Sequence, residues 1–176
     1  MREKSVGAAA LVEGARMLVE VCRAGGARGV DVIINDRVDI ALASGADGVH
    51  LGQGDMPVRE ARRIAGGKLL VGVSTSTIEE ARRARQDGAD YCGVGPMFAT
   101  ATKRKDVIVG PAYLREYVRH EPKLLPHLAI GGITAGNVGE LVTAGVKGVA
   151  VSSCVCGAEE PGEVCGKLCA LLSARF

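Results

Sequence analysis

The sequence predicts an α/β fold with a parallel sheet, and three observations lead to it. Helical and strand-like segments alternate along the chain, a glycine-led phrase recurs where helices give way to strands, and small polar or charged residues follow the strands. Short apolar runs of this type suit strands that are buried on both faces. Strands that alternate with helices over short links form parallel sheets with right-handed crossovers.

The recurring phrase, called the junction phrase below, marks the helix-to-strand junctions. It is found at Gly45-Ala46-Asp47, Gly88-Ala89-Asp90 and Gly145-Val146-Lys147, each time after a helical stretch and before a short apolar run. Glycine is favoured just after a helix because it adopts the left-handed conformation that ends the helix. The phrase therefore predicts three strands, which begin shortly after Asp47, Asp90 and Lys147.

The other elements follow from apolar periodicity. Three further strands are expected at Val30–Ile34, Leu69–Ser74 and His127–Ile130. Helices are expected at Ala8–Cys22, Val38–Ser44, Pro57–Ala65, Ile78–Asp87, Ala112–Arg119, Asn137–Ala144 and Gly162–Leu172. Pro57 and Pro111 suit helix starts, since proline is tolerated in the first turn.

The polar residues favour a (β/α)8 barrel over an open dinucleotide-binding sheet. No Gly-x-Gly-x-x-Gly motif follows an early strand. In a barrel, chemistry lies at the carboxyl ends of the strands, with a phosphate site after the last two. Such a barrel has eight strands and about 200–250 residues, whereas this chain has 176 residues, begins with a helix and offers six strands. We therefore expect one incomplete barrel domain over residues 1–176 that lacks the first strand, the first helix and the second strand.

Composition excludes several classes of function. Of the residues, 47% are hydrophobic and 24% charged, the net charge is +2, and no apolar run is long enough for a membrane span. The N-terminus shows no secretory signal, so a cytoplasmic location is expected. Aromatic residues make up 3% and basic residues are scattered, which argues against nucleic acid as a partner. The sequence leaves open whether the chain forms a homo-oligomer.

The six cysteines are interpreted as small buried hydrophobic residues. A zinc site is the alternative for the four C-terminal ones, but they lack paired Cys-x-x-Cys motifs and a nearby histidine. They are Cys22, Cys92, Cys154, Cys156, Cys165 and Cys169.

Two aspartates at neighbouring strand ends suggest a metal site. Asp36 and Asp55 would converge on one rim, and carboxylates there suit Mg²⁺, which bridges to phosphate oxygens of a substrate. The alternatives are a helix cap for Asp36 and a turn for Asp55. His50 lies inside a strand, where a structural imidazole is favoured over a catalytic base.

Three further segments suit anions. The loop Thr100-Ala101-Thr102-Lys103 offers hydroxyls, backbone amides and a cation; its alternative is a solvated basic turn. Gly131-Gly132, with Ser152-Ser153 after the next strand, matches a barrel phosphate site; a purely steric turn is the alternative. Arg2 and Lys4 could take a diphosphate, or belong to a disordered terminus.

The chain resembles the thiamine-phosphate synthase family. The resemblance rests on an ordered set of short segments along nearly the whole chain: Arg2-Glu3-Lys4, Ile34-Asn35-Asp36-Arg37, Gly48-Val49-His50-Leu51-Gly52-Gln53, Gly72-Val73-Ser74-Thr75, Gly93 to Phe98, Thr100-x-Thr102-Lys103 and Ala129 to Ile133. It implies a (β/α)8 barrel that joins a hydroxymethylpyrimidine diphosphate to a thiazole phosphate, or its carboxylate, with Mg²⁺, releasing pyrophosphate. The products are thiamine phosphate and pyrophosphate.

The resemblance also implies roles for individual residues. Asp36 and Asp55 would hold Mg²⁺, and Lys103 and Ser74 would be catalytic, with Ser74 near the pyrimidine and the reacting methylene. The diphosphate would be bound by Arg2, Lys4, Asn35 and Lys103. The thiazole phosphate would be bound by Thr100, Ala101, Thr102, Gly132, Ser152 and Ser153.

Departures from the family pattern leave two alternatives. Ala99 and Ala101 replace common prolines, Ser152 replaces an aliphatic residue, and the family's first strand, helix and second strand are not found here. One alternative is a thiazole tautomerase, which works by proton transfer and does not need the aspartates or Lys103. The other is an inactive truncated remnant that binds a partner chain through unpaired strand edges.

Overall fold

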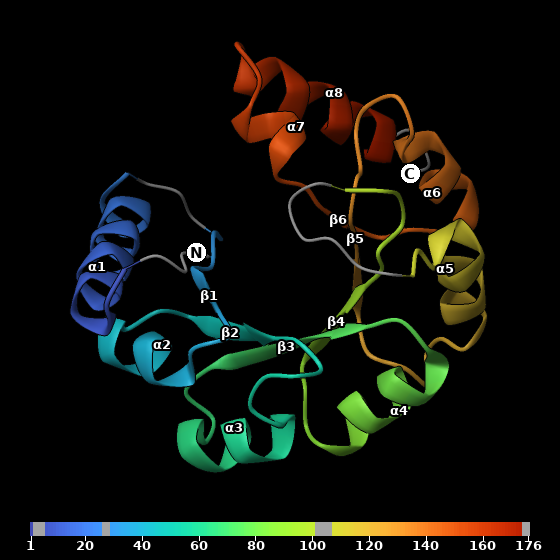
Figure 1. Ribbon diagram of the computed structural model, residues 1–176. Helices are drawn as coiled ribbons and strands as arrows, with labels where there is room; N and C mark the ends of the chain where they lie inside the picture. Colours follow the sequence, from blue (N-terminus) through green and yellow to red (C-terminus); the bar gives the residue numbers. More distant parts are fainter. Residues whose placement is uncertain (2–5, 26–28, 101–106, 174–176) are drawn as a thin grey trace. The chain divides into compact units, whose positions relative to one another are not determined.

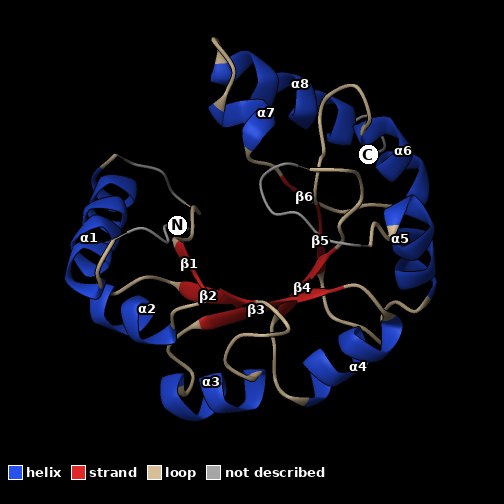
Figure 2. Cartoon of the chain, in the orientation of Figure 1, coloured by secondary structure: helices blue, strands red, loops and turns tan. Residues whose placement is uncertain are grey.

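The computed structural model spans residues 1–176 and describes all of them except 2–5, 26–28, 101–106 and 174–176. In the described parts, strands and helices alternate as predicted (Figure 2), which confirms the α/β class and the six strands. The chain divides into two compact units. The first unit comprises Met1–Ser74 and Ala84–Asp90, and the second comprises Thr75–Arg83 and Tyr91–Phe176. The single domain predicted from the sequence stays a prediction.

The first unit holds three parallel strands in chain order. Its elements, labelled in Figure 1, are α1 (Ala8–Ala24), β1 (Ile33–Asn35), α2 (Val38–Ser44), β2 (Gly48–Leu51), α3 (Val58–Ala65) and β3 (Leu70–Thr75), whose last residue is grouped with the second unit. Asn35 of β1 lies opposite His50 of β2, which lies opposite Gly72 of β3. Because the strands are parallel, their carboxyl ends lie along one edge. Val49 and Leu51 are fully buried and anchor the core of this unit.

The second unit repeats this arrangement with β4 (Tyr91–Val94), β5 (His127–Ile130) and β6 (Val149–Ala150), again parallel and in chain order. Its helices are α5 (Gly110–Arg119), α6 (Val138–Ala144), α7 (Ser153–Cys156) and α8 (Pro161–Ser173). Helix α4 (Ile78–Gln86) is shared between the units. Met97, Leu114, Tyr117 and Leu141 are almost completely buried and form much of the core here.

Several element bounds differ from the expected ones. The strand predicted at Val30–Ile34 begins only at Ile33, since Val30 is 55% exposed and the Val32 amide donates to a carboxylate oxygen of Asp47 at 2.8 Å. Pro57 is the residue before α3, whereas Pro111 lies in the first turn of α5 as predicted. Helix α7 was not predicted, because its four residues are too short for apolar periodicity.

The junction phrase does end helices. Gly45 and Gly145, which follow α2 and α6, have φ values of 71° and 94°, and Gly88, after α4, has a φ of 91°. These values lie in the left-handed region that glycine adopts without a steric penalty. The physical reason given for the repeat is therefore confirmed.

Among the described residues, none of the helices combines the length and the apolar character needed to cross a bilayer.

Candidate active site

Asp36 is held in an unusual backbone conformation at the end of β1. Its φ is +65°, and no other described non-glycine residue has a positive φ. The Asp36 amide donates to the carbonyl of His50 at 2.8 Å, and the Arg37 amide donates to the carbonyl of Asn35 at 2.8 Å, which closes a three-residue turn. Strain at such positions is characteristic of functional sites, and Asp tolerates it better than most residues. The helix-cap alternative for Asp36 is wrong, because the N-cap of α2 is Arg37.

Asp55 is anchored within the loop between β2 and α3. One of its carboxylate oxygens accepts the Gly52 amide at 2.7 Å, and its own amide donates to the Gly52 carbonyl at 3.2 Å. The turn alternative for Asp55 is therefore observed. It does not conflict with metal binding, because an ionised carboxylate has two oxygens with about four lone-pair sites.

The chemistry of these two side chains fits Mg²⁺. The described residues contain no group of three or more His, Cys, Asp or Glu side chains arranged to hold a metal ion. Mg²⁺ differs from metals that need such a cage, since it typically binds one or two carboxylates and takes its other ligands from water and substrate phosphates. Asp36 and Asp55 follow neighbouring parallel strands of the first unit. Their role as metal ligands stays a prediction.

Ser74, near the end of β3, is held at two points within the first unit. The Nε2 atom of His50 lies 3.0 Å from the Ser74 hydroxyl oxygen, and the amide of the Gln53 side chain donates to the Ser74 carbonyl at 2.7 Å. Both His50 and Ser74 are half-buried. The link from His50 to Ser74 could not be predicted from the sequence, because the two residues are 24 positions apart and are brought together by strand register.

In the second unit, the loops after β4 and β5 are joined by their backbones. The Met97 amide donates to the Ile130 carbonyl at 2.9 Å, and the Phe98 amide donates to the Gly131 carbonyl at 3.0 Å. A Cβ on Gly132, whose φ is +63°, would overlap the Ala99 carbonyl oxygen. The steric alternative for Gly132 is therefore observed, and a backbone contact to phosphate at this glycine stays a prediction.

Asn137 braces the loop that follows Gly132. Its side-chain amide donates to the Gly132 carbonyl at 2.9 Å, and its side-chain oxygen accepts the Thr134 amide at 2.8 Å. Helix α6, which begins after it, has only seven residues. Anion contacts predicted at this point would therefore come from loop amides more than from a helix dipole, which is weak in so short a helix.

Ser152 and Ser153 lie after β6, beside the glycines. β6 pairs with β5 through Ile130 and Ala150, so the loops that follow these two strands start at the same edge. Both serines are exposed. The Ser152 carbonyl accepts the amides of Val155 and Cys156 at 2.9 Å, which fixes the first turn of α7. The structure thus brings these serines and Gly132 to one edge of the second unit.

The remaining predicted site residues are only partly described. Thr100, which lies between β4 and α5, is half-buried. Arg2, Lys4, Ala101, Thr102 and Lys103 lie outside the described residues, and their roles stay predictions.

The interpretation of the cysteines holds for one of them. Cys92 is buried, and burial raises the pKa of its thiol above the ordinary value, which keeps it protonated. Cys22 and Cys154 are half-buried. The interpretation is wrong for Cys156, Cys165 and Cys169, which are exposed on α7 and α8.

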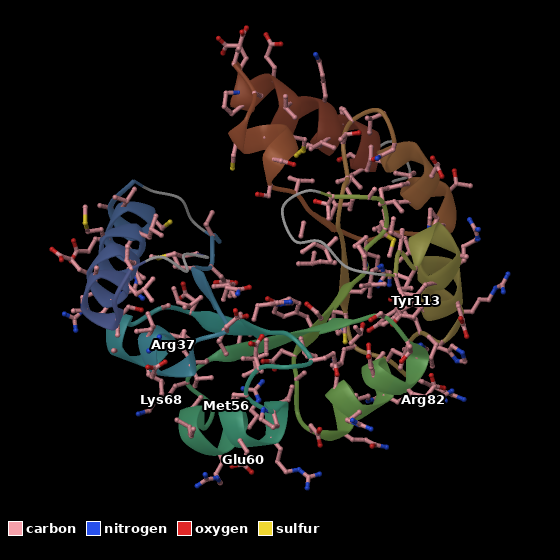
Figure 3. All side chains as sticks on the ribbon, viewed as in Figure 1. Arg37, Met56, Glu60, Lys68, Arg82 and Tyr113 are labelled. Atoms are coloured by element: carbon pink, nitrogen blue, oxygen red, sulfur yellow. The ribbon has the colours of Figure 1, made fainter. Side chains whose placement is uncertain are left out.

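Two buried tyrosines of α5 make polar contacts within the second unit. The Tyr113 hydroxyl, on α5 (labelled in Figure 3), donates to the Thr77 carbonyl at 2.8 Å and lies 3.2 Å from the Thr75 hydroxyl. The Tyr117 hydroxyl donates to the Leu125 carbonyl at 2.9 Å. Burial raises the pKa of both tyrosines, so they remain neutral donors. They tie α5 to two separate loops.

Comparison with known proteins identifies the family to which this chain is similar. Residues 1–155 match the family described as Thiamine monophosphate synthase. The thiamine-phosphate synthase of Chlorobium luteolum is 42% identical, over 98% of this chain and 80% of that protein, and that of Gloeobacter violaceus is 47% identical, over 92% of this chain and 46% of that protein. A solved structure of thiamine phosphate pyrophosphorylase from Pyrococcus furiosus matches 98% of this chain and 80% of its own chain, with a TM-score of 0.86 and 36% identity. That likeness confirms the predicted fold class.

The relatives differ in length from this chain. It spans less than half of the Gloeobacter violaceus enzyme, at 46%. It spans 33% of the bifunctional protein ThiM/ThiE of Symbiobacterium thermophilum, to which it is 47% identical.

Proposed function

Since the chain belongs to the thiamine monophosphate synthase family, we propose that it is a transferase that makes thiamine phosphate. It would join a hydroxymethylpyrimidine diphosphate to a thiazole phosphate and release pyrophosphate. One observation carries the proposal: the family match spans residues 1–155, and the segments on which the resemblance rests lie largely at the carboxyl ends of successive strands. The proposal places the enzyme in the cytosol and gives it small molecules as partners.

The proposed reaction requires stabilisation of the charges that develop on the pyrimidine and on the departing pyrophosphate. An aminopyrimidine stabilises a cation at its exocyclic methylene once the diphosphate departs, so no nucleophilic side chain is needed. The larger demand is to stabilise the departing pyrophosphate, which preorganised cations and donors do most effectively. Mg²⁺, when bound, would neutralise part of the diphosphate charge.

Residues of the first unit would bind the diphosphate. Asp36 and Asp55 are proposed to hold Mg²⁺, and Arg2, Lys4, Asn35 and Lys103 are proposed to contact the diphosphate oxygens. The turn that fixes Asp36 supports this role, because a carboxylate held by its backbone needs little reorganisation when a ligand binds. Ser74 is proposed to lie beside the pyrimidine, where His50 and Gln53 restrict its position.

Residues of the second unit would bind the thiazole phosphate. Gly132, Ser152 and Ser153 are proposed to contact the phosphate with Thr100, Ala101 and Thr102. The interlocked loops after β4 and β5 support this role, since they hold the backbone amides in fixed positions. A thiazole held in place attacks the pyrimidine cation with a high effective concentration, which supplies much of the remaining rate acceleration.

The test is an assay of the purified 176-residue chain with both substrates. We expect formation of thiamine phosphate and an equal amount of pyrophosphate, dependent on Mg²⁺ and abolished by a chelator. Conversion of the thiazole in the absence of the pyrimidine diphosphate would favour the tautomerase alternative. Failure to form thiamine phosphate, by a chain whose unfolding is cooperative, would contradict the proposal.

The metal role of Asp36 can be separated from its backbone role. Asn also tolerates a positive φ, so Asp36→Asn should keep the turn and remove the charge. We expect the Mg²⁺ concentration for half-maximal activity to rise at least about tenfold while the free energy of unfolding changes by less than about 1 kcal/mol. Asp39→Asn is the matched control, because Asp39 is 65% exposed and pairs with Arg37. An unchanged Mg²⁺ requirement in Asp36→Asn would refute the assignment.

A further inference from the structure

We propose that His50 is a positioning residue for the transfer reaction, and that it acts through the hydroxyl of Ser74. The inference rests on the proposed function, which puts Ser74 next to the pyrimidine. It goes beyond that function because the sequence gives His50 only a structural role. Three features of the first unit carry it: the place of His50 in the sheet, the hydrogen bond to Ser74, and the separate anchoring of the Ser74 backbone.

The sheet directs the His50 side chain toward Ser74. Val49 and Leu51, on either side of it in β2, are fully buried, whereas His50 is half-buried. Successive side chains of a strand point to opposite faces, so His50 lies on the other face of β2. Opposite it on β3 is Gly72, which has no side chain. The imidazole can therefore extend along β3 to Ser74, two residues further on and on the same face, at 3.0 Å.

The two contacts on Ser74 do different things. Gln53 binds its carbonyl at 2.7 Å and therefore fixes the main chain, whereas His50 binds its hydroxyl. A serine side chain has three staggered rotamers, and a hydrogen bond to one of them fixes the direction of the hydroxyl. Without His50 the main chain would stay in place while the hydroxyl would sample other rotamers. Loss of the imidazole should therefore lower kcat more than it lowers the free energy of unfolding.

His50 is also linked to Asp36 through its backbone. Its carbonyl accepts the Asp36 amide at 2.8 Å, and this bond does not depend on the side chain. Substitution of the imidazole should therefore leave this backbone contact to Asp36 in place. This separates an effect through Ser74 from a general disturbance of the first unit.

The experiment is a double-mutant cycle with His50→Ala and Ser74→Ala, measured as kcat and KM. We expect His50→Ala to lower kcat about tenfold, with little change in KM, and to have no further effect in the Ser74→Ala background. His50→Gln, whose side-chain amide can still reach the hydroxyl, should recover part of kcat. The Mg²⁺ concentration for half-maximal activity should not change in His50→Ala. His120→Ala, at the end of α5, is the matched control and should leave kcat unchanged.

Losses that multiply in the double variant would overturn the positioning role, and so would a changed Mg²⁺ requirement in His50→Ala. A second readout does not depend on activity: the ¹⁵N resonance of His50 Nε2 should shift in Ser74→Ala at constant pH, and an unchanged resonance would also overturn the role. A wild-type chain that makes no thiamine phosphate would contradict the proposed function itself. An active wild type with independent losses would contradict the role of His50 alone.

Discussion

The two units carry the same junction phrase with opposite charge. In the first unit its third residue is an aspartate, and Asp47 and Asp90 accept the amides of Val32 and Val71 at 2.8 and 2.7 Å. In the second unit the third residue is Lys147, which cannot accept an amide proton and instead pairs with Glu121 at 2.9 Å. Glu121 in turn lies 2.9 Å from Nδ1 of His127, at the start of β5. The two junctions of the first unit thus bind directly to a strand or to the residue before it, and the junction of the second unit is linked to a strand through a buried imidazole.

The two direct hydrogen bonds, to Asp47 and to Asp90, differ in the number of further contacts that hold the carboxylate in place. Asp90 also pairs with Arg62, whose guanidinium donates to the carbonyls of Gly88 and Leu69 at 2.6 and 2.7 Å and whose side chain is only 23% exposed. Within the described part of the chain, Asp47 pairs with Arg23 at 3.9 Å, and the Arg23 side chain is 66% exposed. The tie through Asp90 should therefore contribute the most to stability, since partly buried, hydrogen-bonded charges cost most when one partner is removed.

The largest effect is expected for Asp90→Ala. The change leaves the amide of fully buried Val71 without its acceptor and Arg62 without its carboxylate. We expect a loss of about 2–4 kcal/mol in the free energy of unfolding, measured by urea denaturation. Asp90→Asn keeps an acceptor oxygen and should lose less, and Asp47→Ala should also lose less. Equal losses in Asp47→Ala and Asp90→Ala would show that the Arg62 network adds nothing.

An intermediate effect is expected from acid on the second unit. The His127 side chain is fully buried, and burial lowers its pKa below the ordinary 6.5 despite the opposing influence of Glu121. Its Nε2 atom has no hydrogen-bond partner among the described residues, so an added proton there would lack an acceptor. The other groups around it are Lys147, Glu121, Tyr117 and, through Tyr117, Cys92.

Because the folded pKa is below the unfolded one, the folded chain binds fewer protons than the unfolded chain. The neutral His127 therefore makes its full contribution to the free energy of unfolding above about pH 6.5. This contribution is lost as the pH falls through the folded pKa, by up to about 1.4 kcal/mol per pH unit. Burial acts to raise the pKa of Glu121, but Lys147 and His127 lower it below the ordinary value. Protonation of the Glu121 carboxylate should therefore affect stability only at more acid pH. Thermal unfolding between pH 7.5 and 5 should show this slope in the wild type and lose it in His127→Gln. A slope that survives in His127→Gln would refute the assignment.

The smallest effect is expected for Lys147→Ala. The lysine side chain is 66% exposed, and ion pairs of this kind contribute about 0–1 kcal/mol. We expect a change in the free energy of unfolding of less than about 1 kcal/mol, together with a higher pKa of Glu121, which ¹³C NMR of its carboxyl would report. Lys123→Ala, on the exposed turn before β5, is the control. A loss of free energy of unfolding as large as that of Asp90→Ala would show that the Lys147–Glu121 ion pair stabilises the fold as much as the contacts of Asp90 do.

What could be predicted from the sequence was local. The left-handed glycines of the junction phrase, the alternation of helices and strands, and the polar residues after the strands follow from neighbouring residues alone. The partners of Asp90 and His50 could not be predicted, because Arg62 is 28 positions from Asp90 and Ser74 is 24 from His50. Such pairs depend on strand register, which the apolar pattern does not determine to the residue. Asn137 was missed for a different reason: Gly132 is only 5 positions away, but its carbonyl becomes the acceptor through the turn at Gly132.

Gly132 affects how mutational scans of this protein would be interpreted. Any side chain there collides with the neighbouring loop at Ala99, so a saturation library should be depleted at this codon under selection for folding alone. Intolerance at Gly132 would then say nothing about substrate. Ser152 and Ser153 are exposed, and their replacement should matter only under selection for growth without thiamine. The ratio of the two selection scores, position by position, would separate ligand contacts from architecture.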